Sequence, residues 1–213
     1  TFHVKPFSAH KWRRCYDVAV NRSRASLVVA VLLFLPLFAG CVGVTNPDGW
    51  AAPVVNGQDV YVATSKGHLS AVTLQDDGSA TARWTFPDKD RDSDKKIEPE
   101  ALYGEPVIDG DRVYLATFSA GVFALNTADG RPAWPVDGTN AGQIDGNIAG
   151  GLTLADGILY FGTTEGRFYA WNAADGTPAW PGPVSFDRGI WATPAVDGER
   201  VFVATMGGEL RAL

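Results

Sequence analysis

The sequence predicts an all-β fold, a β-propeller built from four-stranded antiparallel blades. Three observations favour it. One unit recurs along the chain, each copy carries the same series of glycine-containing turns, and the segments between the turns are apolar on successive residues. A repeat of roughly 40 to 50 residues with four short strands per copy is typical of propeller blades.

The repeat is clearest in residues 114–135 and 160–181, which read YLATFSAGVFALNTADGRPAWP and YFGTTEGRFYAWNAADGTPAWP. Aligning the turns extends the pattern to four copies, which begin at Trp50, Leu102, Ile148 and Ile190. The glycines of the first turn lie 53, 47 and 41 positions apart, at Gly57, Gly110, Gly157 and Gly198. This period indicates one blade per copy.

Each copy contains two further turns. The second turn carries a glycine in every copy, at Gly67, Gly121, Gly166 and Gly207. The third is an Asp-Gly pair in the first three copies, at Asp77-Gly78, Asp129-Gly130 and Asp175-Gly176. Such residues tolerate the positive φ of tight hairpins, so three turns predict four antiparallel strands per blade.

The strand after the first turn is apolar on successive residues in every copy, at residues 60–63, 113–116, 159–162 and 201–204. Alternation would indicate one face in water, whereas continuous apolarity indicates a strand covered on both faces. We therefore expect each blade to pack between two neighbours.

A tryptophan follows each Asp-Gly turn by a few residues, at Trp84, Trp134 and Trp180. We expect these residues on the outermost strand of each blade, where a large ring docks against the neighbouring blade. An exposed aromatic platform for a ligand is the alternative interpretation.

The repeats occupy residues 50–213, and the fourth copy ends within its third strand, since Ala212-Leu213 align with Ala124-Leu125. About three and a half blades do not close a ring, and open ends expose apolar faces and unpaired strand edges. We therefore expect this chain to be part of a longer protein, or otherwise to oligomerise or remain only partly folded.

The segment before the repeats has the order of a targeting sequence. Residues 22–40 carry two arginines, then an apolar run, then a glycine directly before Cys41. The run of about 13 residues suits the helix of a secretory signal peptide and is shorter than the roughly 20 residues of a transmembrane helix. We interpret residues 1–21 as an upstream extension and 41–49 as a tether.

The stretch PLFAGC, residues 36–41, resembles a bacterial lipobox, in which the cysteine is lipidated and becomes the first residue of the mature chain. Phe38 stands where leucine is commonest. The resemblance implies an extracytoplasmic lipoprotein that is anchored to the membrane through Cys41. The alternatives are a transmembrane anchor and a plain signal peptide with an incidental cysteine.

Charge is divided unevenly along the chain. Residues 1–40 hold six Lys or Arg and one acid, which leaves 12 basic and 23 acidic residues and a net charge of −11 for the remainder. Phosphate backbones would repel so acidic a body, so nucleic acid is not an expected partner. A protein or a cationic partner stays possible.

The sequence offers few candidates for catalysis or metal binding. His68 is the only histidine after Cys41, so a hydrolytic triad or a His-rich metal site lacks its parts. The acidic run at 88–96 lacks the glycine and glutamate that a calcium loop needs. The polar loop of residues 137–147 is a candidate ligand site at the ring mouth, or else a plain connector; its candidate contacts are Asn140, Gln143 and Asp145.

The stretches PVVNGQDVYVAT (53–64), GVFALN (121–126) and DGRPAW (129–134) resemble the PQQ-like repeat. That repeat occurs in quinoprotein dehydrogenases and in the BamB family of outer-membrane assembly lipoproteins. Similarity to the BamB family implies a lipid-anchored β-propeller scaffold that binds envelope or cell-surface proteins. The lack of catalytic and cofactor motifs in the sequence favours a protein with no cofactor and no enzymatic activity. A small-ligand or sugar sensor is the first alternative. A PQQ-dependent dehydrogenase is the second, although the adjacent Cys-Cys pair usual in those enzymes is not visible here.

Overall fold

The computed structural model describes residues 49–136 and 138–213, which lie in one compact unit, Thr45–Leu213. The predicted extension, signal helix and Cys41, and all of the tether but its last residue, fall outside the described residues. Within the described part, every helix is too short to cross a membrane.

Fifteen strands and two short 3-10 helices make up the described part of the chain. The first two blades contain β1 (Val54–Asn56), β2 (Asp59–Ala63), β3 (Leu69–Leu74), β4 (Ala80–Phe86), β5 (Val107–Asp109), β6 (Arg112–Thr117), β7 (Gly121–Asn126) and β8 (Pro132–Trp134). The next two contain β9 (Thr153–Ala155), β10 (Ile158–Gly162), β11 (Arg167–Asn172), β12 (Val184–Ser185), β13 (Ala195–Asp197), β14 (Arg200–Ala204) and β15 (Leu210–Ala212). The helices η2 (Asp92–Asp94) and η3 (Ala141–Gln143) lie in the links between blades.

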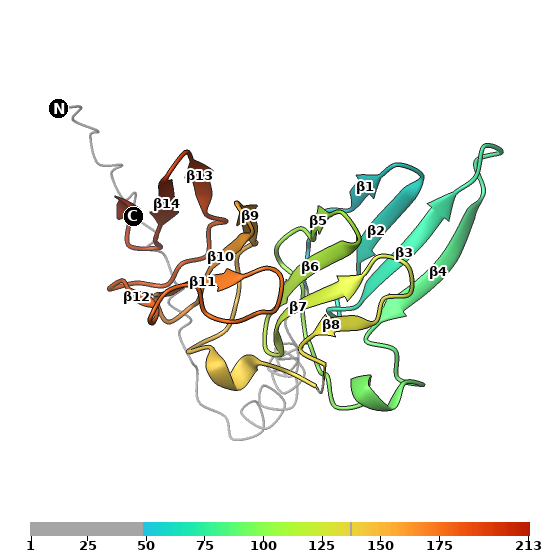
Figure 1. The fold of residues 1–213 in the computed structure, drawn as a ribbon, viewed down its shortest axis with the longest axis horizontal. Helices are drawn as coiled ribbons and strands as arrows, with labels where there is room; N and C mark the ends of the chain where they lie inside the picture. The colour runs from blue at the N-terminus through green and yellow to red at the C-terminus, as the bar shows by residue number, and fades with distance from the viewer. Residues whose placement is uncertain (1–48, 137) are drawn as a thin grey trace, which may run out of the picture. The chain divides into compact units, whose positions relative to one another are not determined.

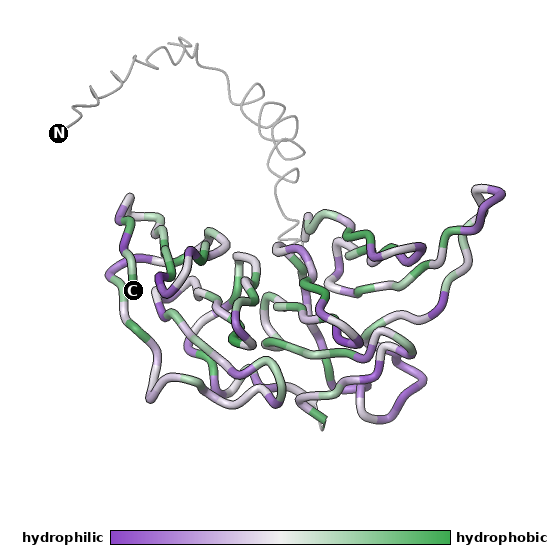
Figure 2. The backbone as a smooth tube through the Cα atoms, turned by 45° about the horizontal axis from the view of Figure 1, so that its top comes forward, coloured by the Kyte–Doolittle hydropathy of each residue, from purple (hydrophilic) through white to green (hydrophobic). Residues whose placement is uncertain are grey.

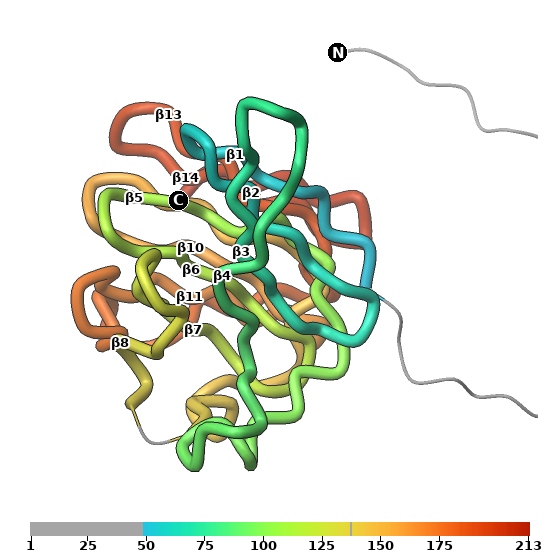
Figure 3. Tube along the Cα trace, turned by 90° about the vertical axis from the view of Figure 1, so that its right-hand side faces the viewer, coloured from blue at the N-terminus to red at the C-terminus, as the bar shows by residue number. Residues whose placement is uncertain are grey.

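The strands form four antiparallel sheets in chain order, which we number blades 1 to 4. Blades 1 to 3 have four strands each and blade 4 has three, which confirms the predicted incomplete propeller. Figure 1 shows the blades following one another from β1–β4 to β13–β15. Seen from the side of blade 1, the sheets lie behind one another (Figure 3).

The third turn of blades 2 and 3 forms because its glycine adopts a left-handed conformation. Gly130 has a φ of 67° and Gly176 a φ of 73°. The side chain of Asp175 accepts hydrogen bonds from the hydroxyl (2.7 Å) and the N–H (2.9 Å) of Thr177. The bond from the Thr177 hydroxyl lowers the pKa of Asp175 most, and the bond from the Thr177 N–H lowers this pKa further.

The apolar core lies between successive blades rather than on one side of a single sheet. On β7, Phe123 and Leu125 belong to the core shared with blade 1, whereas Val122 and Ala124 belong to the core shared with blade 3. Both faces of this strand are therefore buried, as the continuous apolar pattern predicts. A third core joins blade 3 to blade 4.

Blades 1 and 4 are each covered on one face only, so the apolar runs overstate their burial, whereas the exposed apolar faces expected at the ends of an incomplete ring are present. Val62 on β2 is 38% exposed, and Leu210 on β15 is 72% exposed. Each of these blades has a neighbour on only one side in the described residues. Blade 1 also carries the β3–β4 hairpin, whose far end stands away from the other strands and is hydrophilic (Figure 2).

Replacing Gly176 by alanine should destabilise the fold more than the same change at Gly157. Their φ values are 73° and 75°, so both variants carry a similar left-handed strain of about 1 kcal/mol. A Cβ on Gly176 would stand 2.6 Å from the ring of Trp134, whereas a Cβ on Gly157 meets nothing within 4 Å. We expect Gly176→Ala to lose a further ~1–3 kcal/mol through overpacking, measured by urea unfolding. Equal losses would contradict the ring contact.

Candidate functional site

Two of the predicted tryptophans lie on the outermost strand and contact the next blade. The indole N–H of Trp84 donates to the carbonyl oxygen of Thr127 (2.9 Å), and that of Trp134 donates to Ala173 (2.9 Å). The ring of Trp84 also covers Gly130, and the ring of Trp134 covers Gly176. A Cβ on either glycine would not fit. A register shift lies beside each tryptophan, and such bulges re-aim a side chain.

Trp180 departs from the prediction, because it lies outside the strands. It stands between an isolated bridge and β12, and its ring packs on Tyr160 and Phe168, with centroids 6.0 Å apart in both pairs. It still lies against the core that joins blade 3 to blade 4, so the predicted contact with the neighbouring blade holds although the predicted strand does not. Pro181 follows Trp180 directly, and Pro183 lies two positions further on. Prolines cannot donate to a strand ladder, which explains why the outer strand is interrupted here.

Asn140 is buried and bonds within the protein. Its side-chain N–H donates to the carbonyl oxygen of Val122 (2.8 Å), and its side-chain oxygen accepts the N–H of the same residue (2.9 Å). A neighbouring strand would make the same pair of bonds, so Asn140 completes the open edge of β7. Its amide is therefore engaged in the fold and does not face a ligand.

Asp145 and Gln143 have different surroundings although they share one loop. The backbone N–H of Asp145 donates to the hydroxyl of Tyr169 (2.7 Å), and its carboxylate pairs with Arg167 (2.9 Å). Both partners lie on β11, so these bonds hold the loop against blade 3. Gln143 is exposed and lines a pocket. Of the three predicted loop residues, Gln143 alone faces an open site.

The pocket lies at the outer edge of blade 3, where the fourth strand is interrupted. The outer strand of blade 1 runs unbroken for seven residues. In blade 3 it is reduced to a single bridge at Pro178 and the two residues of β12. The intervening residues 180–183, Trp-Pro-Gly-Pro, lie outside the ladder and leave a hollow beside β11.

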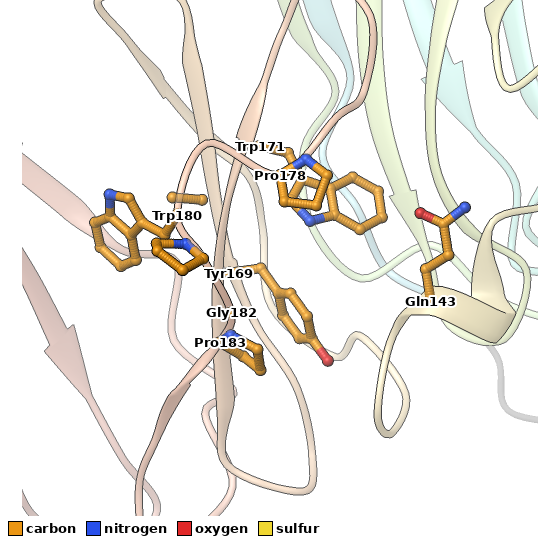
Figure 4. A pocket seen from close by; sticks show the side chains of 9 residues that line it. Gln143, Tyr169, Trp171, Pro178, Trp180, Gly182 and Pro183 are labelled. Carbon is orange, nitrogen blue, oxygen red and sulfur yellow. The ribbon is translucent and has the colours of Figure 1, made fainter.

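The pocket has a volume of about 120 Å³ and a mainly apolar lining. Figure 4 shows Trp180 and Pro183 at one side of the pocket and Gln143, on η3, at the other. Its full lining is Gln143, Tyr169, Ala170, Trp171, Pro178, Trp180, Pro181, Gly182 and Pro183. None of these side chains carries a charge, so the site is suited to binding an apolar group rather than to acid–base chemistry.

One buried charged group links blade 1 to blade 2. The buried carboxylate of Asp94 accepts a bond from Arg91 (3.1 Å), whose guanidinium also donates to the carbonyl oxygen of Gly130 in blade 2 (3.3 Å). Burial lowers the pKa of His68, and the positive charge of Lys89 adds to the effect. No group of three or more His, Cys, Asp or Glu in residues 49–136 and 138–213 is placed to hold a metal ion.

Sequence reasoning singled out Trp180 and Gln143 but missed the rest of the pocket. Tyr169 and Trp171 read as ordinary core residues of an inner strand. The available signal was the pair of prolines around a glycine after Trp180, because two prolines within three residues are incompatible with a continuous strand.

The stacked four-stranded sheets and the tryptophan contacts between them define a β-propeller of PQQ-like repeats. The chain belongs to the family of the outer membrane protein assembly factor BamB, which matches residues 43–137 and 135–213. BamB of Escherichia coli strain K12 is 34% identical over 82 residues, 38% of this chain and 20% of that protein. BamB of Shigella dysenteriae serotype 1 matches to the same extent.

Solved structures share the fold at lower identity. The crystal structure of BamB from Moraxella catarrhalis has a TM-score of 0.56 and 22% identity, covering 76% of this chain and 45% of that one. A quinohemoprotein alcohol dehydrogenase from Pseudomonas putida HK5 has a TM-score of 0.56 and 18% identity, covering 76% of this chain and 29% of the enzyme. The chain thus spans less than half the length of these natural relatives.

Changing an amide to a carboxylate should destabilise the fold at Asn140 and not at Gln143. Aspartate at 140 places an acceptor against the carbonyl oxygen of Val122 and loses the donor that satisfies it. We expect Asn140→Asp to lose about 2–4 kcal/mol in chemical unfolding. Gln143→Glu, on an exposed side chain, should stay within about 0.5 kcal/mol of the parent. A stable Asn140→Asp protein would refute the role of this amide in closing β7.

Proposed function

We propose that this protein is a lipid-anchored, extracytoplasmic β-propeller that binds other proteins of the bacterial cell envelope. The observation that carries the proposal is family membership over residues 43–213. The E. coli relative is named as an outer membrane protein assembly factor. By that likeness, the partners of this chain are envelope proteins, and its role is to assist the assembly of outer-membrane proteins.

The surface of the described residues supports a binding role. Trp50 is 73% exposed and Trp191 is 50% exposed. Each stands seven residues before the first-turn glycine of its copy, Gly57 or Gly198, so the two occupy equivalent positions in blades 1 and 4. Exposed aromatic side chains are enriched at protein–protein contacts. The likeness to quinohemoprotein dehydrogenases is a likeness of fold alone, so it adds no support for an oxidoreductase.

The anchor is proposed from the sequence. The order of arginines, apolar run and glycine before Cys41 favours lipidation of that cysteine. One acyl chain binds a membrane only marginally, whereas the two or three chains of a bacterial lipoprotein hold it firmly.

Loss of the gene should lower the amount of folded outer-membrane β-barrel protein in the source organism, because an assembly factor would be missing. The measurement is the heat-modifiable fraction of porins on gels of isolated outer membranes. A plasmid copy of the full gene should restore the parental level. Unchanged porin levels in the deletion strain would remove the assembly role.

Replacing Cys41 by alanine should release the protein from the membrane fraction, since the acceptor of the acyl chains is removed. Mass spectrometry of the parent should show an N-terminal peptide that begins at Cys41 and carries acyl chains. Cys15→Ala, a change at the other cysteine, is the matched control and should leave fractionation unchanged. Membrane retention of Cys41→Ala would contradict the lipid anchor.

A further inference from the structure

We propose that the pocket at the outer edge of blade 3 binds a proline ring of an extended segment from a partner protein. The inference rests on the proposed protein-binding function and names the partner chemistry for one site. It places the contact at the interrupted outer strand, between Tyr169, Trp171 and Trp180, rather than on the loop of polar residues that the sequence suggested.

The size of the pocket limits its occupant to a single small group. Its volume is about 120 Å³, whereas pockets for drug-sized ligands or cofactors measure roughly 300–1,000 Å³. A quinone cofactor or a sugar chain would remain mostly in solvent. One side chain of a larger partner fits, and pockets that accept a single anchor side chain are typical of the centre of protein interfaces.

The lining selects an apolar ring over a charged or strongly polar group. Three aromatic side chains and three prolines surround the hollow, and none of the lining side chains is charged. A carboxylate or ammonium group would lose hydration here and gain no ion pair. Aromatic-lined sites recognise proline-containing segments, which are already extended and therefore lose little conformational entropy on binding.

The rim supplies the polar contacts that an extended backbone needs. Gln143 is exposed at one side, and its side-chain amide offers both a donor and an acceptor. The hydroxyl of Tyr169 accepts the N–H of Asp145 and so holds the loop that carries Gln143 in place. A prolyl residue has a carbonyl acceptor and no N–H, so donors at the rim match its backbone.

The pocket is held open by a stiff wall. Pro178, Pro181 and Pro183 fix the backbone φ at three positions of the lining. Trp180 is fixed in turn by its contacts with Tyr160 and Phe168. A preformed site loses little entropy when it is filled, which favours binding of a short segment.

Fluorescein-labelled hexaproline is the probe, added to the full protein and followed by fluorescence anisotropy. A labelled Gly-Ser peptide of equal length is the control peptide. We expect saturable binding of hexaproline and none of the Gly-Ser peptide. If hexaproline does not bind, or if both peptides bind alike, the inference is wrong.

Gly182→Val is the blocking variant, because Gly182 lines the pocket and a Cβ there meets open space. Gly142→Val is its matched control: Gly142 lies outside the lining, its Cβ also meets open space, and neither glycine has a positive φ. We expect Gly182→Val to weaken hexaproline binding at least about tenfold, which is the effect of losing one anchor contact. Gly142→Val should leave hexaproline binding unchanged. Trp180→Ala should weaken binding similarly, with folding checked by circular dichroism.

The outcomes separate this inference from the proposed function. Equal binding by the parent and Gly182→Val would overturn the pocket site, whatever the porin measurement shows. Specific loss of hexaproline binding in Gly182→Val would support the site even in a strain whose porin levels do not depend on the gene, in which case the assembly role alone would fail.

Discussion

The structure depends on the burial of both faces of each inner sheet against its neighbours. A four-stranded sheet of such short strands has little core of its own, so successive blades stabilise one another. The tryptophan on the outer strand fixes that stacking, because its ring covers a glycine turn of the next blade and its N–H satisfies a carbonyl there. Trp84 and Trp134 make this contact in the same way, which sets one spacing and one orientation for each pair of blades.

The same constraint explains which parts of the fold could be predicted. Glycine turns and continuous apolar runs are local signals, and they identified the blades, the hairpins and the strand order. The exposure of one face in blades 1 and 4 has no local signal in the sequence. Val62 has the same kind of sequence environment as the buried Leu115, and only the presence of a neighbouring blade distinguishes the two residues. Exposure therefore follows from stacking order, which no single repeat encodes.

The candidate site was less predictable because its geometry depends on where pairing stops. Asn140 looked like a ligand contact in a polar loop, yet it bonds to Val122, 18 positions away, where β8 no longer covers β7. The pocket depends in a similar way on the interrupted outer strand of blade 3. An unpaired strand edge gives Asn140 its structural role and also creates the pocket. Strand propensities do not predict which edge stays unpaired.

The outer strand is the element in which blades can differ without loss of the stack. The strands β6 and β10 carry core residues on both faces, so changes there would disturb two interfaces at once. The outer strand, by contrast, is seven residues long in blade 1, three in blade 2 and two in blade 3. In blades 1 and 2 it presents the tryptophan that contacts the next blade, and the remaining residues of this edge can differ without disturbing the core. In blade 3 the Trp-Pro-Gly-Pro stretch uses that freedom, which is why a repeat whose core is uniform can carry one distinct site.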